Sequence, residues 1–289
     1  MRSLRTAGRS AALIAVLLCA APVARAADEA PGEALDYIEV VTADAEADAP
    51  LPMIVAVHGL GDRPESFQLL FARLDVAARV ILPRGPVGYG EDGYSWFPMR
   101  RGSGDDDGFV RGVRQSAGRV ASLVATLVAK RPTVGKPVVT GFSQGGIMSF
   151  ALATLHPETV AAAVPVAGFL PQELWPEPTA TVQPQAGLPM VLALHGEKDG
   201  VIPLDRARWT VEVLKTRGYK AELRSYPNVS HTVSRDMRHD LLNALAAAAE
   251  EPAPVAPDSE APDPEASDPA GAGSAGLSGE LRAVVADRR

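Results

Sequence analysis

The sequence has one cysteine among its 289 residues, Cys19, and the apolar stretch that contains it is short. This stretch, AALIAVLLCAAPV, falls below the roughly 20 residues that a membrane-spanning helix needs. Arginines precede it and the small-x-small pattern of residues 24–26 follows it, which predicts a cleaved signal peptide over residues 1–26. A mature chain that begins at Ala27 then has no thiol for a disulfide, a thiolate metal site or a cysteine nucleophile.

Two other interpretations of the first segment are a membrane anchor and a lipoprotein modified at Cys19. The short apolar run disfavours the anchor. Leu18 disfavours the lipoprotein, because a small residue is wanted immediately before the modified cysteine. The signal peptide predicts a secreted or periplasmic protein without stable membrane insertion.

Basic charge is also scarce. Removing the four arginines of residues 1–26 leaves 24 of the 28 Lys and Arg residues against 35 Asp and Glu, a formal net charge of −11. Contacts with phosphate groups need clustered Lys and Arg. We therefore exclude nucleic acid and anionic membrane as the main partner.

The carboxyl-terminal segment lacks apolar periodicity. From EPAPVAPDSEAPDPEASDPAGAGSAGLSGE onward, Pro, Ala, Gly, Asp and Glu dominate, and such a composition cannot offset its ordering entropy by burial. We predict a disordered acidic tail over residues 251–289 and one folded domain over residues 27–250. A solvated end is favoured over docking of the closing LRAVVADRR.

Between these ends, short apolar runs alternate with longer segments of helical period. Several runs are continuously apolar, as expected for parallel strands covered on both faces. The expected strands are 52–59, 79–85, 137–143, 160–168, 189–196 and 221–227, and the expected helices are 107–130, 144–155, 204–217 and 232–249. This alternation predicts an α/β domain with a mostly parallel central sheet and helices on both faces.

The stretch TGFSQGGIMSF sets Ser143 between Gly141 and Gly145, where an expected strand meets an expected helix. A Gly-x-Ser-x-Gly at such a junction is typical of a nucleophile elbow, a tight turn that exposes the serine above the sheet. The alternative is a glycine-rich turn whose serine caps the helix. The junction favours the elbow, with Ser143 as a nucleophile.

A serine nucleophile needs a general base and an acid that orients the base. In folds with this elbow, the partners follow in the order Ser, Asp or Glu, then His. Of the five histidines, only His231 and His239 come after a suitable acid, and only His231 lies in a loop beyond the last strand. We predict His231 as the base, with a helix-capping surface residue as the alternative.

The segment HGEKDGVIP places candidate acids in the loop after the next-to-last strand. Asp199 is preferred because the turn through GVIP can direct its carboxylate toward His231. Glu197 and Asp205 are nearby rivals.

Acyl transfer also needs preorganised donors for the negative charge on the carbonyl oxygen. The amide of Gln144 follows the nucleophile at a helix start, where orphan N–H groups favour an anion. A second donor is expected in HGLGDR, where the amide of Leu60 lies between Gly59 and Gly61. An ordinary glycine turn is the alternative for this loop.

Five motifs together resemble a known family: HGLGD, SWF at residues 95–97, GFSQGG, HGEKDGVIP and the SH of residues 230–231. In order and spacing they are similar to the carboxylesterase and phospholipase branch of the α/β-hydrolases, which includes the acyl-protein thioesterases. The resemblance covers about residues 52–245. It implies the α/β-hydrolase fold, hydrolysis of esters or thioesters in a shallow acyl groove, no cofactor and no metal. The residues it implies are Ser143, Asp199 and His231 as triad, the amides of Leu60 and Gln144 as oxyanion hole, and Trp96 near the site.

Four apolar side chains are expected to line the acyl or aryl groove, because they fall in loops at the carboxyl ends of strands. They are Trp96, Phe97, Phe169 and Leu170. Ordinary loop packing is the alternative for each of them.

The sequence departs from thioesterases that act on protein lipid anchors, because it has an export signal and an acidic tail, and PMRRGSGDDDGF is more charged than a lipid-binding lid. A small soluble ester is therefore the expected substrate.

Within GSGDDDGF the three aspartates are consecutive, so they cannot face one calcium ion, and a solvated turn is favoured. A peptidase, a dienelactone-type hydrolase and a noncatalytic binding protein on the same fold are alternatives. The sequence indicates no oligomeric state.

Overall fold

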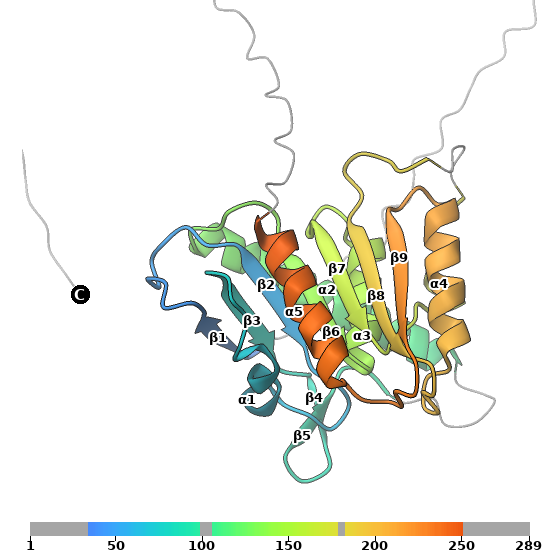
Figure 1. The fold of residues 1–289 in the computed structure, drawn as a ribbon. Coiled ribbons are helices and arrows are strands. Elements are labelled where there is room, and N and C mark those ends of the chain that lie inside the picture. Colours follow the sequence, from blue (N-terminus) through green and yellow to red (C-terminus); the bar gives the residue numbers. More distant parts are fainter. Residues whose placement is uncertain (1–33, 99–105, 179–182, 251–289) are drawn as a thin grey trace, which may run out of the picture. The chain divides into compact units, whose positions relative to one another are not determined.

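The computed structural model describes residues 34–98, 106–178 and 183–250 (Figure 1). Contacts divide the chain into two units, Met1–Ala253 and Pro254–Arg289, and every described residue belongs to the first. The predicted signal peptide with its cysteine, the predicted tail and the first half of GSGDDDGF lie outside the described residues. Within the described ranges, no helix is both long and apolar enough to cross a membrane.

Seven strands form the central sheet, in the order β1-β3-β2-β6-β7-β8-β9. The edge strand β1 runs antiparallel to β3, and all other neighbours are parallel. The carboxyl ends of six strands therefore meet at one edge of the sheet, the lower edge in Figure 1. The strands are β1 Tyr37–Val41, β2 Met53–Val57, β3 Arg79–Pro83, β6 Val138–Phe142, β7 Ala162–Val166, β8 Met190–Gly196 and β9 Ala221–Tyr226.

Alternate residues of the central strands pack into two hydrophobic cores. In β2, Met53, Val55 and Val57 belong to the first core, and Ile54 and Ala56 belong to the second. Side chains alternate across a strand, so a strand with a core on each face must be apolar at every position. This explains why the sequence of β2 is continuously hydrophobic.

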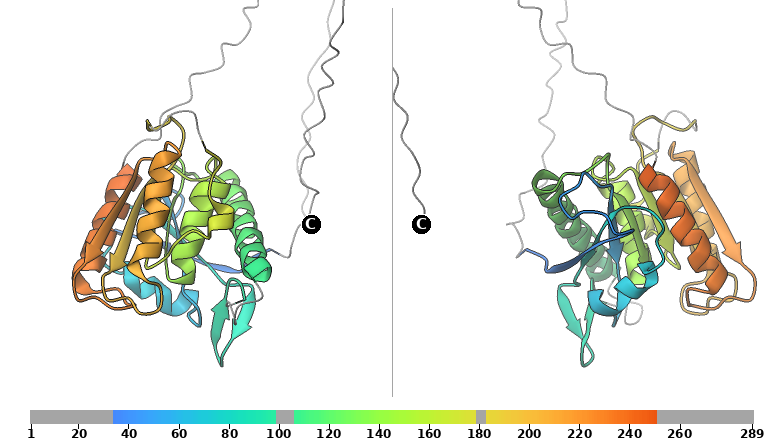
Figure 2. Two further views of the ribbon diagram at one scale, coloured as in Figure 1. Left: turned by 90° about the vertical axis from the view of Figure 1, so that its right-hand side faces the viewer. Right: turned by 60° about the vertical axis from the view of Figure 1, so that its left-hand side comes forward.

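The two cores are closed by helices on opposite faces of the sheet, as the two views of Figure 2 show. Side chains of α2, α3 and α4 belong to the first core, and those of α1 and α5 belong to the second. The helices are α1 Pro64–Phe67, α2 Asp106–Lys130, α3 Gln144–Leu155, α4 Leu204–Thr216 and α5 Arg235–Glu250, with 3-10 turns η1 Gln68–Phe71 and η2 Gln172–Leu174. The predicted α/β domain with a mostly parallel sheet and helices on both faces is confirmed.

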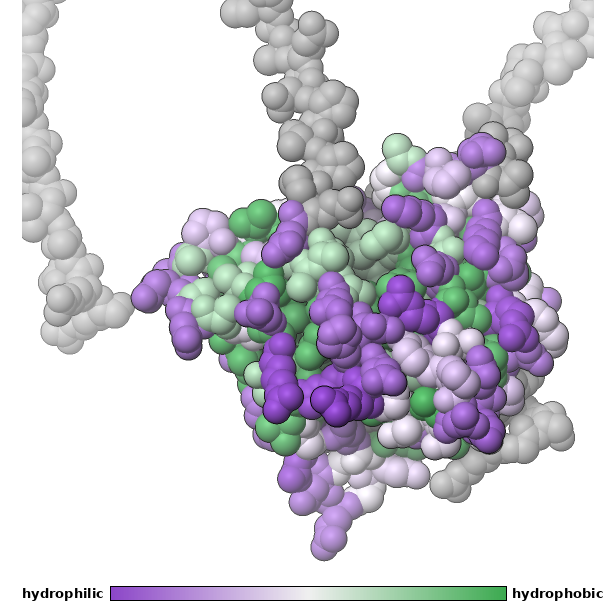
Figure 3. All heavy atoms as spheres, viewed as in Figure 1, coloured by the Kyte–Doolittle hydropathy of each residue, from purple (hydrophilic) through white to green (hydrophobic). Residues whose placement is uncertain are grey.

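A separate antiparallel hairpin consists of β4 Val87–Tyr89 and β5 Gly93–Ser95. It projects from the lower edge in Figure 1, and hydrophilic residues gather at its tip in Figure 3. The N–H of Gly61 donates to the carbonyl of Tyr94 at 2.9 Å, and the N–H of Tyr94 donates to the carbonyl of Asp62 at 3.0 Å. Main-chain hydrogen bonds therefore attach the hairpin to the loop after β2.

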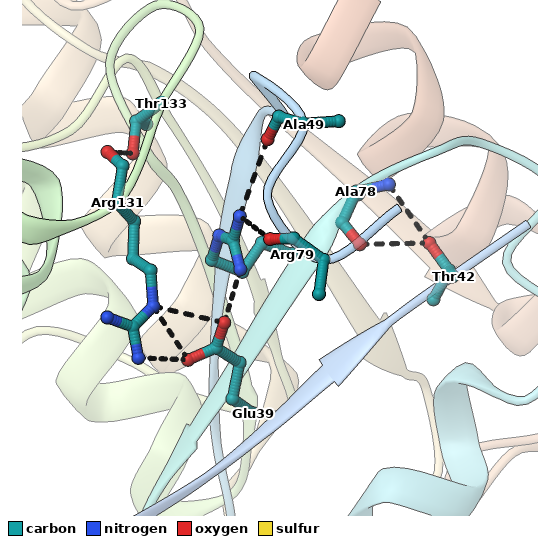
Figure 4. A network of polar contacts seen from close by, with 8 residues as sticks. Glu39, Thr42, Ala49, Ala78, Arg79, Arg131 and Thr133 are labelled. Carbon is teal, nitrogen blue, oxygen red and sulfur yellow. Dashed lines mark hydrogen bonds and ion pairs between the residues drawn. The ribbon is translucent and has the colours of Figure 1, made fainter. Parts of the chain in front are cut away.

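The edge strand β1 is held by a charged network, shown in Figure 4. Arg79 on β3 is only 1% exposed, pairs with Glu39 on β1 and donates to the carbonyl of Ala47 at 2.8 Å. Glu39 also accepts from Arg131, whose Nη2 lies 3.1 Å from Oε2. Burial alone would raise the pKa of Glu39, but the hydrogen bonds from Arg131 and Arg79 outweigh it and hold that pKa below its ordinary value.

Candidate active site

Ser143 occupies the turn between β6 and α3 with φ 57° and ψ −112°, a backbone conformation that non-glycine residues rarely adopt. Its N–H donates to the carbonyl of Val166 and its carbonyl accepts from the N–H of Ile147, both at 3.0 Å. Although Ser143 is the N-cap of α3, its side chain makes no capping hydrogen bond. The structure therefore contradicts the helix-cap alternative and leaves the hydroxyl for another partner.

The close approach of α3 to β2 requires Gly145. A Cβ added there would overlap the carbonyl oxygen of Val57 and lie 2.9 Å from that of His58. Both are main-chain atoms at the end of a buried strand, so they cannot move aside without displacing the sheet. The glycine thus brings the elbow against the loop that follows β2.

The side chains of His231, Asp199 and Ser143 form one line of hydrogen bonds. Nδ1 of His231 lies 2.7 Å from Oδ2 of Asp199, and Nε2 lies 2.9 Å from Oγ of Ser143. A carboxylate accepts and does not donate, so Nδ1 carries the proton and Nε2 can accept the proton of the hydroxyl. The ring of Phe142 packs on the imidazole with centroids 4.9 Å apart. The arrangement can therefore transfer a proton from Ser143 to His231.

Asp199 lies in the loop between β8 and α4, and its side chain is fully buried. Its Oδ1 accepts from the N–H groups of Val201 at 2.9 Å and Ile202 at 2.8 Å. These two bonds fix the carboxylate plane and turn Oδ2 toward His231.

The rival residues have other partners. Glu197 accepts from the hydroxyl of Ser225 at 2.8 Å. Asp205 pairs with Arg208, and the side chain of His239 is 74% exposed. The structure thus brings Asp199 rather than Glu197 or Asp205 to the histidine, and His231 rather than His239 to the serine.

A further histidine, His195, lies buried beside Asp199. Its Nε2 is 2.8 Å from the carbonyl of Ile202, to which it donates, and 3.4 Å from Oδ2 of Asp199. Burial lowers the pKa of His195, which favours the neutral form of its ring. His195 supports the loop that carries Asp199, a role that the sequence patterns do not reveal.

The loop after β2 lies directly against the elbow. A Cβ placed on Gly59 would be 3.3 Å from the carbonyl oxygen of Phe142 and 3.6 Å from Cβ of Ser143. Leu60 follows Gly59, and Gln144 is the first residue of α3, at the positive end of its dipole. Of the two predicted oxyanion donors, Gln144 therefore directly follows the serine, and Leu60 follows a glycine that lies beside it.

A family model described as phospholipase/carboxylesterase matches residues 36–248. The chain belongs to this family. The match extends from β1 to α5 and confirms the resemblance carried by HGLGD, GFSQGG and HGEKDGVIP. By family, the chain is an esterase-like hydrolase.

Curated relatives are similar over most of the folded part. A probable carboxylesterase of Oryza sativa subsp. japonica is 29% identical over 202 residues, which cover 65% of this chain and 74% of the relative. Acyl-protein thioesterase 1 of Gibberella zeae is 24% identical over 196 residues, 62% of this chain and 83% of the relative. A probable inactive carboxylesterase of the same rice subspecies is 27% identical over 198 residues, 62% of this chain and 78% of the relative.

Solved structures share the fold of this phospholipase/carboxylesterase family member. Esterase PE8 has a TM-score of 0.63 at 22% identity and covers 75% of this chain and 100% of its own. Acyl-protein thioesterase 2 of Zea mays has a TM-score of 0.61 at 24% identity and covers 73% of this chain and 98% of its own. The predicted α/β-hydrolase fold is confirmed.

In this family member, the side chain of Gln144 holds the SWF segment. Its Oε1 accepts from the N–H of Trp96 at 2.9 Å, and its Nε2 donates to the carbonyl of Phe97 at 3.1 Å. The residue is 2% exposed. The sequence pattern predicts a role only for the amide of Gln144, because nothing in the motif indicates where its side chain is buried.

The four side chains expected to line a groove are buried in the first core. Their exposed fractions are 1% for Trp96 and Phe97, 5% for Phe169 and 2% for Leu170. The indole Nε1 of Trp96 donates to the carbonyl of His58 at 2.9 Å. The structure thus corrects their placement from an open groove to the core, and their contact with a substrate stays a prediction.

Two adjoining shallow hollows, about 380 and 400 Å³, lie against the β4–β5 hairpin. The second reaches Gly61 in the loop after β2, and both are lined by Arg63, Tyr89 and Asp92. Arg63 and Asp92 form an ion pair at 3.1 Å. The surface beside the loop after β2 therefore carries charged side chains together with apolar area. Among the described residues, no cluster of three or more His, Cys, Asp or Glu side chains could hold a metal ion.

Proposed function

We propose that this chain is a serine hydrolase that cleaves carboxylic esters through a Ser143–His231–Asp199 triad and an acyl-enzyme. The observation that carries the proposal is the line of hydrogen bonds from Asp199 through His231 to Ser143, at 2.7 and 2.9 Å. Each member presents the atom that the chemistry requires, with an acceptor nitrogen facing the hydroxyl.

In the proposed reaction, Oγ of Ser143 attacks the ester carbonyl carbon while Nε2 of His231 takes its proton. The carbonyl oxygen becomes negative and is bound by the amides of Leu60 and Gln144. The intermediate collapses, and the alcohol leaves with the proton from His231. A water molecule then attacks the acyl-enzyme, again with His231 as base, and the acid is released with Ser143 restored.

The proposal is tested by labelling the purified protein with a fluorophosphonate and measuring hydrolysis of nitrophenyl acetate. Ser143→Ala should abolish labelling and lower kcat about 10⁴-fold or more. Ser230→Ala is the matched control, because Ser230 is an exposed serine directly before His231. Labelling that persists in Ser143→Ala places the nucleophile elsewhere. A wild-type protein that neither labels nor hydrolyses esters favours the noncatalytic alternative, and one relative is named a probable inactive carboxylesterase.

Short, soluble esters are the proposed substrates. The burial of Trp96, Phe97, Phe169 and Leu170 supports this choice over long-chain lipids, as do the charged side chains in the hollows beside the loop after β2. A series of nitrophenyl esters of increasing acyl length should give its highest kcat/KM at short chains. A maximum beyond about ten carbons would instead support a lipid or thioester substrate, and cleavage of peptide amides without ester turnover would support a peptidase.

A secreted or periplasmic location is part of the proposal and rests on the sequence of residues 1–26 alone. Expression of the full chain with its leader should yield an exported protein that begins near Ala27. Intact mass spectrometry of the exported fraction measures this directly, and a full-length chain that stays in the cytoplasm contradicts it.

A further inference from the structure

His58, the first residue of HGLGD, is a buried histidine outside the proposed triad. It directly follows β2 and is 1% exposed. Its Nδ1 lies 2.7 Å from the carbonyl oxygen of Gly59, and its Nε2 lies 3.0 Å from the backbone nitrogen of Gly85. An amide N–H can only donate, so Nε2 accepts from Gly85 and Nδ1 must carry the proton donated to Gly59. The two contacts therefore select one neutral tautomer.

The environment maintains this neutral form. Burial lowers the pKa of His58, and its hydrogen bond to Gly59 raises it by less. The ring packs against the indole of Trp96 with centroids 5.1 Å apart, and Trp96 Nε1 donates to the carbonyl of His58 at 2.9 Å. His58 is thus held both through its ring and through its main chain.

The hydrogen bond to Gly59 has a geometric consequence for the next residue. In a planar trans peptide, the carbonyl of one residue and the N–H of the following residue point in opposite directions. The Gly59 carbonyl is directed at Nδ1 of His58 and also accepts from the N–H of Asp62 at 3.3 Å. The N–H of Leu60 must then point away from His58. Because Gly59 lies beside Cβ of Ser143, this peptide plane borders the nucleophile.

We propose that His58 is a positioning residue for the oxyanion hole, which orients the Leu60 N–H by holding the preceding carbonyl. The inference rests on the proposed function, since the Leu60 amide matters only if Ser143 forms a tetrahedral intermediate. His58 does not touch the substrate and acts through the Gly59–Leu60 peptide.

Two variants of His58 separate its two hydrogen bonds. In His58→Asn, the side-chain amide nitrogen is as many bonds from Cα as Nδ1, so it can still donate to Gly59. In His58→Gln, the amide oxygen is as many bonds from Cα as Nε2, so it can still accept from Gly85 but leaves Gly59 without its main donor. Both variants bury one carboxamide, which makes them matched controls for packing and stability.

Steady-state hydrolysis of nitrophenyl butyrate should distinguish the variants. Loss of one oxyanion donor costs about 10² to 10³ in kcat, so a misdirected donor in His58→Gln should lower kcat about 10- to 100-fold with KM within about 3-fold. His58→Asn should keep kcat within about 5-fold of the wild type. An alkyl boronic acid, which mimics the tetrahedral intermediate, should bind His58→Gln more weakly by the factor lost in kcat/KM.

Each outcome decides between distinct explanations. A wild-type protein without Ser143-dependent turnover removes the proposed function, and this inference with it. An active wild type with equal kcat in the two variants, or with unchanged boronate affinity in His58→Gln, overturns the inference alone. A fall in both variants that follows their melting temperatures shows a merely structural role, and also overturns it.

Measurements on the unaltered protein cover the case in which a variant does not fold. Nitrogen-15 NMR of the His58 ring should show a protonated Nδ1 and an unprotonated Nε2, with and without the boronic acid. The Leu60 amide resonance should shift when the boronic acid binds. A proton on Nε2, or a Leu60 amide that does not respond, contradicts the proposal.

Discussion

Replacing Asp199 by asparagine should disable the base by changing its tautomer. The N–H groups of Val201 and Ile202 both donate to one carboxylate oxygen, so they should select the oxygen of the new side chain. The NH₂ group would then face Nδ1 of His231, where Oδ2 now lies at 2.7 Å. A donor in this position requires Nδ1 to lose its proton, and the proton moves to Nε2. A protonated Nε2 cannot accept the proton of Ser143.

The expected fall in kcat follows from the loss of His231 as a proton acceptor. An acid-to-amide change that imposes the wrong tautomer in a serine triad lowers kcat about 10⁴-fold, which corresponds to about 5.5 kcal/mol of activation free energy. The two hydrogen bonds from the loop remain, so the melting temperature should change by only a few degrees. Initial rates with nitrophenyl butyrate and a thermal melt measure both quantities.

Asp205→Asn is the control, because Asp205 is 67% exposed and pairs with Arg208 on the surface of α4. It should keep full activity. If Asp199→Asn retained more than about a tenth of the wild-type kcat, the tautomer argument would be refuted. Loss of activity in Asp205→Asn alone would transfer the role of the acid to that residue.

Three other changes have expected outcomes. His231→Gln should lower kcat about 10⁴-fold or more, whereas His239→Gln should be nearly normal, and equal effects on initial rates would refute the choice of base. Glu39→Gln should cost about 2 kcal/mol at neutral pH, because it leaves a buried guanidinium without its counter-charge. The pKa of Glu39 is lower in the folded protein than in the unfolded chain. The stability that Glu39 contributes is therefore fully present above the ordinary pKa of a glutamate, and it is lost as the pH falls through the folded-state pKa. The melting temperatures of wild type and variant should thus converge in acid. A difference that is independent of pH would contradict this. Gly145→Ala should displace the elbow and lower kcat more than about 100-fold, while Gly200→Ala, with open space at its Cβ, should be neutral in the same assay.

The order of the candidate triad could be predicted because the topology constrains it. A parallel sheet brings the carboxyl ends of its strands to one edge, so residues that follow β6, β8 and β9 meet there even though 88 positions separate Ser143 from His231. Apolar runs predicted β6 and β8 because both faces of these strands are largely buried, whereas β9 lies at the edge of the sheet and is partly exposed. Sequence position and residue type were therefore sufficient to select Ser143, Asp199 and His231 for the experiments above.

Other features depend on contacts that no local pattern indicates. The edge strand Tyr37–Val41 is half-buried and is held partly by Glu39, and the hairpin strands have three residues each and contain glycine, so neither has a clear period. Phe169 and Leu170 are buried because their side of the loop faces the core, and residue type alone does not indicate which side of a loop does so. The hydrogen bonds of His58 likewise require the fold that places Gly85 beside it.

The main-chain attachment of the β4–β5 hairpin bears on how this scaffold can change. Every residue except proline offers the same N–H and carbonyl, so the two bonds to Tyr94 do not depend on which side chains the tip carries. Neither hairpin strand pairs with a strand of the seven-stranded sheet in the described part of the chain, so altering the tip leaves the register of that sheet untouched. Gly93 is the exception, because a Cβ there would collide with the backbone of Gly61. Loops grafted between Tyr89 and Gly93 should therefore vary the rim of the site while the Ser143 elbow stays intact. This segment is thus a place where ester selectivity can change without disturbing the rest of the fold.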